Sequence, residues 1–281
     1  TFHYVPLDKL PMFGSQRLYV DAAWVMRPGG LFVQPIWQAE KPDMRGLDDY
    51  LTAARARGVD VMPCVNRTPD WYAGVSENNG MNSNNYPPVK PGNDRKRVES
   101  WADWAEFWFQ FVARYGSVQH PDSVLRVDTT PKYQNQPLNV KKSGLGLVKC
   151  VEIGNEYDRW WDVGTDKYLR PEEYAAMLAA CYQACKRADP AITVVMGGLT
   201  GFDMKYLQAM LAAFQALGLP FQSDKINVHH YSNRYNEYAK WPPTWRDSSA
   251  CFPEQDKDFP MIREVVQFGR SLGLETWVTE F

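Results

Sequence analysis

The sequence predicts an α/β protein whose parallel strands curl into a barrel. Short runs rich in β-branched residues alternate with amphipathic helical stretches along the 281 residues, which is the pattern of successive strand–helix–strand units. Several of the runs are apolar throughout, as expected when both faces of a parallel sheet are covered. No glycine-rich phosphate-binding motif follows any of them, so a barrel is favoured over a nucleotide-binding doubly wound sheet.

Strands and helices are expected to alternate from residue 17 to residue 279. The helical period is clearest where Trp101, Trp104 and Trp108 recur on one face of a single stretch. The expected strands are residues 17–25, 59–65, 147–153, 192–196, 225–231 and 274–279, and the expected helices are residues 47–57, 100–115, 171–188, 204–217 and 259–272.

The composition narrows the class of protein. There are 31 Lys and Arg against 33 Asp and Glu, a net charge of −2, which gives no electrostatic footprint for nucleic acid. No apolar run approaches the ~18 residues of a membrane span. The length suits one α/β barrel of about 250 residues, so residues 1–281 are expected to form a single barrel domain.

The five cysteines are interpreted as structural thiols. No C-x-x-C pair occurs among Cys64, Cys150, Cys181, Cys185 and Cys251, which removes support for a zinc or thioredoxin-type site. Cys181 and Cys185 are four residues apart on an expected helix, where two buried thiols are expected.

Aromatic residues and long connections both point toward the barrel mouth. Aromatic residues make up 14% of the chain, which fits either a Trp-rich core or rings that stack on sugars, and the sequence leaves both open. Three connections, residues 66–99, 120–143 and 232–258, are too long for simple turns. The first and third follow strands, so in a barrel they lie at the carboxyl face, where active sites are built. Disorder is the alternative for the Asn- and Gly-rich first connection.

Carboxylates end two of the expected strands. Asn155 and Glu156 follow strand 147–153, and Glu280 follows strand 274–279. Two carboxyl groups at strand ends of one barrel suit glycoside hydrolysis, in which one protonates the leaving oxygen and the other attacks or activates water.

Strand 225–231 carries polar residues on one face. Alternation places Asn227, His229 and Tyr231 together, which is unusual for a buried strand unless they line a site. The aspartates that follow Glu156 lack the spacing of an oxygen-ligand loop. The sequence therefore predicts a polar site with no metal and no other cofactor.

These motifs resemble clan A glycoside hydrolases, a superfamily of retaining (β/α)8-barrel enzymes with the TIM-barrel fold. The resemblance extends over nearly the whole chain, and it rests on the order and spacing of the GNE segment at 154–156 and the TEF segment at 279–281. It implies that Glu156 is the acid/base, that Glu280 is the nucleophile, and that Asn155 hydrogen-bonds the sugar 2-hydroxyl.

The same resemblance implies supporting roles for residues on two other strands. His229 and Tyr231 match a His-x-Tyr pattern that supports the nucleophile, and Arg17 matches an Arg on the second barrel strand. A buried ion pair with Glu152 or Asp21 is the alternative for Arg17. The candidate sugar-stacking residues are Trp71, Trp160, Trp161, Trp241 and Trp245.

Numbered by this resemblance, the six expected strands are the second to the seventh of an eight-stranded barrel. The first and eighth strands are expected to be lacking within residues 1–281, which makes the domain an excerpt of a longer protein. Flanking sequence or another chain is expected to supply them. An irregular first strand within residues 1–16 is the alternative.

The resemblance implies hydrolysis of O-glycosidic bonds in a polysaccharide or oligosaccharide by a retaining double displacement that uses two Glu. A non-catalytic glycan-binding or structural barrel is the alternative, although Glu stands at both 156 and 280. A metal-dependent hydrolase is disfavoured, because the strand ends carry no His/Asp ligand set. Polysaccharide breakdown predicts an extracellular, periplasmic or cell-surface location.

Overall fold

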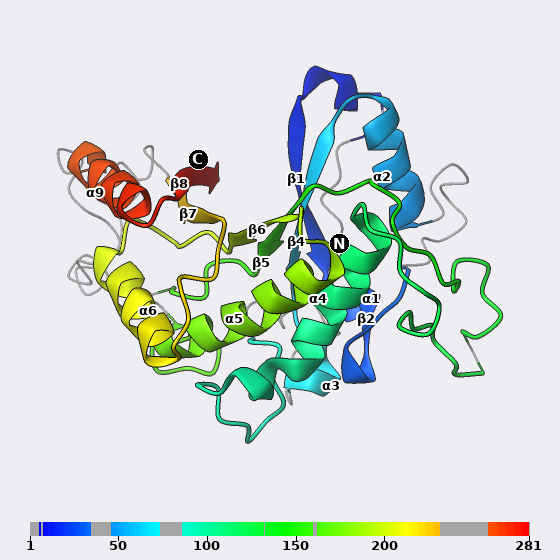
Figure 1. Ribbon diagram of the computed structural model, residues 1–281, viewed down its shortest axis with the longest axis horizontal. Helices are drawn as coiled ribbons and strands as arrows, with labels where there is room; N and C mark the ends of the chain where they lie inside the picture. The colour runs from blue at the N-terminus through cyan, green and yellow to red at the C-terminus, as the bar shows by residue number, and fades with distance from the viewer. Residues whose placement is uncertain are drawn as a thin grey trace, which may run out of the picture.

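The computed structural model describes residue 6 and residues 8–34, 46–73, 86–131, 133–159, 162–230 and 258–280; for residues 71, 73 and 258–261 it describes the backbone alone. The central sheet has six parallel strands in the order β1-β4-β5-β6-β7-β8, curled into a half-barrel with helices between the strands (Figure 1). The strands are β1 Ser15–Asp21, β4 Asp60–Asn66, β5 Cys150–Ile153, β6 Thr193–Met196, β7 Lys225–His229 and β8 Glu275–Glu280.

All five expected helices are present, with ends that differ from the prediction by no more than about two residues, as is usual at helix ends. α2, α5 and α9 pack on strands of the sheet, while α4 and α6 both pack on α5. The helices are α2 Leu47–Ala56, α4 Ala102–Tyr115, α5 Pro171–Ala188, α6 Met204–Ala216 and α9 Asp258–Ser271, with short turns α1 Ala22–Val25, α3 Asp70–Ala73, η1 Leu10–Met12, η2 Pro28–Gly30 and η4 Val98–Trp101.

The predicted strand 17–25 is wrong at its carboxyl end. β1 stops at Asp21, because the chain turns into α1, and the Ala23 N–H donates to the Arg67 carbonyl instead of continuing the sheet. A small antiparallel hairpin follows, formed by β2 Met26–Arg27 and β3 Leu31–Phe32. A Cβ at Gly30 would collide with the Asp103 carbonyl, so the hairpin packs directly on the α4 backbone. The predicted strand 225–231 likewise ends early, at His229.

The Trp-rich face of α4 forms the centre of the core. Trp101, Trp104 and Trp108 are all fully buried, as the helical period predicts. Trp104 stacks on Phe107 with ring centroids 4.9 Å apart, and the Phe32 ring of the hairpin meets Phe111 edge to face at 5.2 Å. The core interpretation is therefore correct for these three tryptophans.

Among the described residues no strand pairs with the outer side of β1 or of β8, in agreement with the predicted incomplete (β/α)8 barrel. A hollow of about 800 Å³ lies within the half-barrel toward the amino ends of its strands, lined by residues of β1, β4, β5, β6 and β8. The six strands correspond to the run predicted from the sequence.

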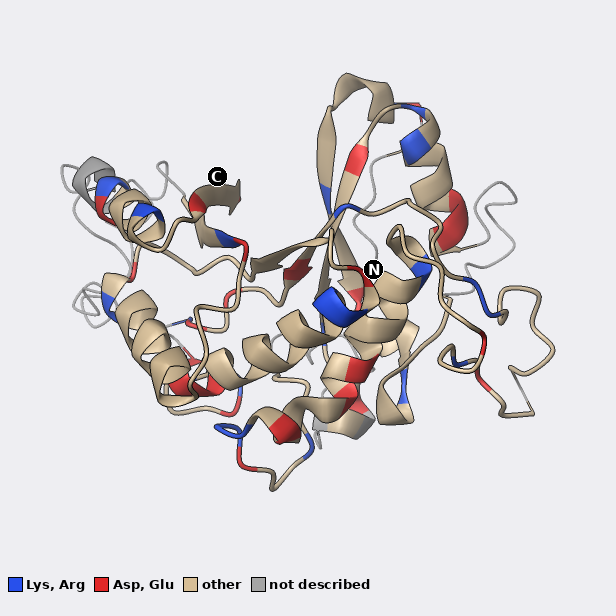
Figure 2. Ribbon diagram, viewed as in Figure 1, with Lys and Arg blue, Asp and Glu red and all other residues tan. Residues whose placement is uncertain are grey.

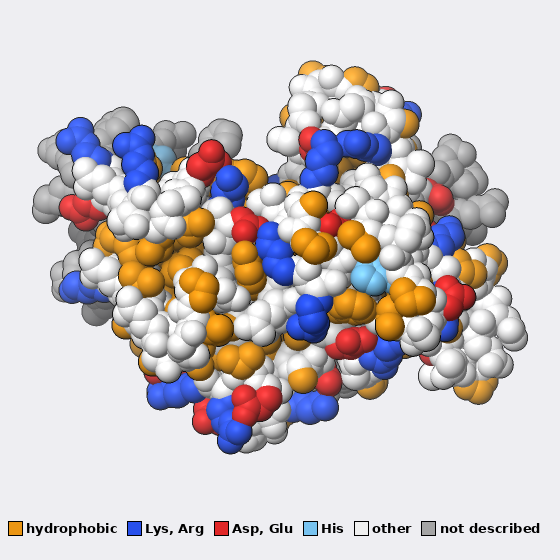
Figure 3. Space-filling model, viewed as in Figure 1, with side chains coloured by type: hydrophobic (Ala, Val, Ile, Leu, Met, Phe, Trp, Pro, Cys, Tyr) orange, Lys and Arg blue, Asp and Glu red, His pale blue; other side chains and the backbone are white. Residues whose placement is uncertain are grey.

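Acidic and basic residues are spread along the chain (Figure 2), and their side chains are interspersed on the face shown in Figure 3, in keeping with the small net charge. Within the described ranges, none of the helices has the length and apolar character needed to cross a membrane.

Replacing Trp108 tests the role of the α4 core. Trp108→Ala is expected to lower the free energy of unfolding by about 3–5 kcal/mol, because a buried indole leaves a cavity that the packed core refills only in part. Trp24→Ala is the matched control, since Trp24 is 60% exposed and its removal is expected to change stability by about 0.5 kcal/mol or less. Urea unfolding of both variants checks this; equal losses would contradict it.

Candidate active site

The carboxyl ends of β5, β7 and β8 bring Glu156, His229 and Glu280 together. His229 Nδ1 lies 2.8 Å from a Glu156 carboxylate oxygen and 3.5 Å from a Glu280 carboxylate oxygen. One ligand atom from each of the three residues falls within 4.8 Å of the others. Because parallel strands end at the same edge of a barrel, residues more than 70 positions apart in the chain share one site.

Two side chains of β1 donate hydrogen bonds to the Glu280 carboxylate. Arg17 and Tyr19 are two residues apart on one strand, so they face the same side of the sheet. The Arg17 guanidinium and the Tyr19 hydroxyl both donate to Glu280 Oε1. Burial raises the pKa of Tyr19 above its ordinary value, which keeps the hydroxyl protonated as a donor. Both donors therefore stay available to the Glu280 carboxylate at neutral pH.

Glu152 is a second, fully buried carboxylate on the other side of Arg17. Arg17 Nε donates to Glu152 Oε2 at 2.5 Å, and Arg17 Nη2 donates to Oε1 at 2.9 Å. The Gly198 N–H at 3.0 Å and Asn227 Nδ2 at 2.9 Å complete its shell of donors. Arg17 thus contacts Glu280 and also forms the buried ion pair with Glu152 that was its alternative, while its role toward a nucleophile stays a prediction.

Asp21, the other candidate partner, lies against Arg67 instead, 3.2 Å from its guanidinium. Asn155 belongs to the Arg17 cluster: its Oδ1 accepts from Arg17 Nη2 at 2.7 Å and lies 3.0 Å from the Tyr19 hydroxyl oxygen. The side chain implied to bind the sugar 2-hydroxyl is therefore anchored by the same groups that hold Glu280.

Glycines shape the backbone around Glu156. Glu156 has φ 49°, a left-handed conformation that costs a non-glycine residue about 1–3 kcal/mol, and its N–H donates to the Gly198 carbonyl at 3.0 Å. A Cβ at Gly198 would collide with His229 Nε2, and a Cβ at Gly197 would collide with the Gly154 carbonyl. The Gly-Gly pair after β6 therefore lets the imidazole and the Glu156 turn lie directly against the backbone, which the sequence analysis missed.

Asp158 is a buried carboxyl beside Glu156. Its oxygens accept from the Thr200 N–H at 3.0 and 3.1 Å and from the Thr200 hydroxyl at 3.1 Å. Burial raises the pKa of Asp158 to about 7, the negative charge of Glu156 adds to the shift, and the Thr200 hydrogen bonds oppose it. The sequence shows an aspartate two residues after Glu156, but nothing in its spacing indicates a buried carboxyl with a raised pKa.

Cys64 forms part of the floor of the site. Its thiol donates to the Gly154 carbonyl at 3.3 Å and lies 3.5 Å from Arg17 Nη2. Burial raises the pKa of the Cys64 thiol well above its ordinary value, so it stays a neutral packing group. Cys181 and Cys185 are buried free thiols, as predicted, whereas Cys251 lies outside the described residues.

Most of the predicted sugar-stacking residues are not placed. Trp71 belongs to the short turn α3 after β4, where only the backbone is described. The remaining predicted site residues outside the described ranges are Tyr231, Trp160, Trp161, Trp241 and Trp245. Their roles stay predictions.

Glu156, His229 and Glu280 also form the one cluster among the described residues with the ligand types and closeness to hold a metal ion. Arg17 argues against that use. Its cationic guanidinium already contacts Glu280, and it would repel a divalent cation bound at the same carboxylate. The arrangement suits proton transfer and nucleophilic attack by two carboxyl groups better.

Fold and site together define a partial (β/α)8 barrel with a carboxylate pair at its carboxyl edge. Among solved structures, the chain is similar to a glucosidase from Croceicoccus marinus, with a TM-score of 0.52 and 14% identity over 97% of this chain and 46% of that one. It is also similar to a family 51 alpha-L-arabinofuranosidase from Bifidobacterium longum, with a TM-score of 0.49 and 16% identity over 98% and 48%.

The chain thus spans about half the length of these two enzymes. No protein-family model matches it, and no curated protein sequence is significantly similar to it. At such low identity the structural likeness shows the fold alone, which is that of a partial (β/α) barrel.

The titration of Asp158 gives a pH test. An unfolded Asp ionises near pH ~3.9, so between that value and about 7 the folded chain retains a proton that the unfolded chain has lost, and stability falls as pH rises. Asp158→Asn removes this effect. Its free energy of unfolding relative to wild type is expected to increase by roughly 2–3 kcal/mol from pH 5 to pH 8.

Urea unfolding at pH 5, 6, 7 and 8 measures that difference. Asp60→Asn, at the exposed amino end of β4, controls for the substitution itself. A difference between Asp158→Asn and wild type that stays constant with pH would contradict the assignment.

Proposed function

We propose that the protein is a retaining glycoside hydrolase that cleaves O-glycosidic bonds in a polysaccharide or oligosaccharide. The observation that carries this proposal is the pair of Glu156 and Glu280, whose carboxylate oxygens both approach His229 Nδ1 and lie within 4.8 Å of each other. Retaining glycosidases hold their two carboxyl groups about 5–5.5 Å apart, against about 6.5–9.5 Å in inverting enzymes. The short separation supports retention.

In this mechanism Glu280 is the nucleophile. Arg17 and Tyr19 donate to its Oε1, which fixes the carboxylate and leaves Oε2 to attack the anomeric carbon. The bond from that carbon to the leaving oxygen breaks as the bond to Glu280 forms, giving a covalent glycosyl-enzyme. Water then attacks the same carbon and releases Glu280.

Glu156 is the acid and then the base. It gives a proton to the leaving oxygen in the first step and takes one from the attacking water in the second. His229 lies between the two carboxylates, 2.8 Å from Glu156, where its ring holds the acid/base in place. The left-handed backbone at Glu156 and its hydrogen bond to Gly198 fix the same side chain from behind.

Conservative replacement of each carboxylate tests the assignment. Glu156→Gln and Glu280→Gln are each expected to lower hydrolysis at least about a hundredfold, because an amide neither transfers the proton nor attacks the sugar. Release of reducing ends from soluble mannan, xylan, arabinan and β-glucan is the measurement. Glu275→Gln, an exposed position on the same strand as Glu280, is the control and is expected to retain activity. Full activity of either site variant would sink the mechanism.

The stereochemistry of the product tests retention separately. The hemiacetal first formed from a β-glycoside is expected to be the β-anomer, since two displacements at one carbon restore its configuration. Proton NMR within the first minutes of reaction distinguishes the anomers before they interconvert. An initial α-anomer would indicate a single displacement by water.

The competing proposal is a non-catalytic glycan-binding or structural barrel. The two open sheet edges favour it, whereas the presence of Glu at both strand ends and of the donors around Glu280 favours catalysis. Glycan binding without any hydrolysis by wild type would decide for the competing proposal.

We also propose that two further strands close the sheet, supplied by flanking sequence or by another chain. The support is that no described strand pairs with the outer side of β1 or of β8, and exposed edges of parallel strands are templates for pairing. A polysaccharide substrate would further place the protein outside the cytoplasm or at the cell surface.

A further inference from the structure

A second hollow, of about 150 Å³, lies beside the β2–β3 hairpin. We call it the Trp24 hollow, after the indole at its rim, which is 60% exposed. Trp24 belongs to α1, the turn that directly follows β1, and β1 carries Arg17 and Tyr19 of the candidate active site. The hollow therefore lies next to the strand end that faces the catalytic carboxylates. Its lining residues are Trp24, Arg27, Val33, Gln34, Asp128, Tyr133, Gln136, Leu138 and Asn139.

The polar wall of the Trp24 hollow is cross-linked by hydrogen bonds. The Asn139 side chain accepts from the Asp128 N–H at 2.9 Å and donates to the carbonyls of Asp128 and Tyr133 at 2.7 and 3.1 Å. The guanidinium of Arg27 lies over the Tyr133 ring, 4.9 Å from its centroid. These contacts hold Asp128, Tyr133 and Asn139 together and join them to Arg27 of the hairpin.

One carboxylate oxygen of Asp128, Oδ2, accepts no hydrogen bond from the described residues of this wall. Its side chain is only 4% exposed, and its Oδ1 accepts from the Thr130 N–H and hydroxyl at 2.9 and 2.7 Å. Its Oδ2 lies 3.6 Å from Arg27 Nε and accepts no hydrogen bond from any described residue. A buried carboxylate oxygen without a hydrogen bond is costly, which indicates that a donor from outside the chain completes it.

The chemistry of the lining selects the ligand. Arg27 and Asp128 are its only charged residues and cancel each other, so the hollow does not select a charged ligand. A flat indole face suits a ring with C–H groups, and the Arg27 donors beside the Asp128 acceptor suit adjacent hydroxyl groups. A cavity of about 150 Å³ accommodates one six-membered ring.

We propose that the Trp24 hollow binds one sugar ring of a neutral glycan chain, with Trp24 stacked on the ring and Arg27 and Asp128 bonded to its hydroxyls. The carbohydrate class of the ligand rests on the proposed function, whereas the existence of the site rests on its own lining. A chain seated there is held beside the end of β1, and this anchors a polymer at the active-site edge of the sheet.

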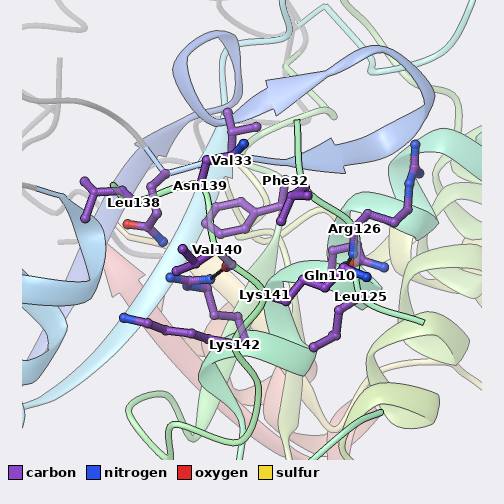
Figure 4. A pocket seen from close by; sticks show the side chains of 13 residues that line it. Phe32, Val33, Gln110, Leu125, Arg126, Leu138, Asn139, Val140, Lys141 and Lys142 are labelled. Atoms are coloured by element: carbon purple, nitrogen blue, oxygen red, sulfur yellow. Dashed lines mark hydrogen bonds between the residues drawn. The ribbon is translucent and has the colours of Figure 1, made fainter. Parts of the chain in front are cut away.

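The hollow next to it does not offer the same site. It shares Val33, Leu138 and Asn139 with the Trp24 hollow and lies between the hairpin and residues 138–142 (Figure 4). Its free volume of about 20 Å³ holds no more than a water molecule, and Lys141 and Lys142 line its far side. The sugar ring is therefore assigned to the Trp24 hollow alone.

Binding measurements on a chain that cannot turn over its ligand test the proposal. In the Glu156→Gln background, Trp24→Ala is expected to weaken the binding of mannan, xylan, arabinan or β-glucan hexasaccharides about tenfold or more by calorimetry, as for loss of a dominant aromatic contact. Trp24→Phe is expected to restore most of the affinity. Met12→Ala is the control, since Met12 is also exposed but lies before the amino end of β1.

Equal affinities of the Trp24→Ala and Met12→Ala chains would overturn the proposal, and so would the absence of binding to every hexasaccharide. Hydrolysis by wild type is measured in parallel and separates the two proposals. Hydrolysis without Trp24-dependent binding removes the Trp24 site and leaves the enzyme. Trp24-dependent binding without hydrolysis leaves the site and removes the enzyme. Urea unfolding of each variant confirms that a lost affinity is not a lost fold.

Discussion

The buried guanidinium of Arg17 is the interaction on which the rest of the site depends. A cation inside a barrel is tolerated only when carboxylates and hydrogen bonds replace the water it has lost. Glu152 and Glu280 both meet that need, so one positive charge is shared between two carboxylates. Asn155 and Tyr19 join the same cluster, which ties the segment before Glu156 to Glu280 through the Arg17 side chain.

The order of elements could be predicted because it depends on periodicity. Apolar runs and the Trp face of α4 carry the pattern of the fold in the sequence itself. The predicted end of the first strand was wrong because a contact with a residue distant in the sequence determines where the strand stops. Residues 22–25 are as apolar as the strand before them, yet the hydrogen bond from Ala23 to Arg67 ends the strand and starts the hairpin. No local signal shows that Arg67 is near.

The candidate site was predictable where its residues end strands, as Glu156, His229 and Glu280 do. It was not predictable where the role depends on register across the sheet. Glu152 stands opposite Cys64 on β4 and Val195 on β6, and only that pairing brings it under Arg17. Gly198 matters because the His229 imidazole occupies the space that a side chain at position 198 would need. The sequence alone does not reveal this contact.

The contact between Arg17 and Glu280 has a mechanical consequence. β1 and β8 are the first and last strands of the sheet, so this ion pair bridges the two ends of the curled sheet across its interior. Any widening of the gap between the edges moves the Glu280 carboxylate away from the Arg17 guanidinium, and any narrowing presses them together. The curvature of the sheet is thereby linked to the position of one carboxylate of the candidate active site.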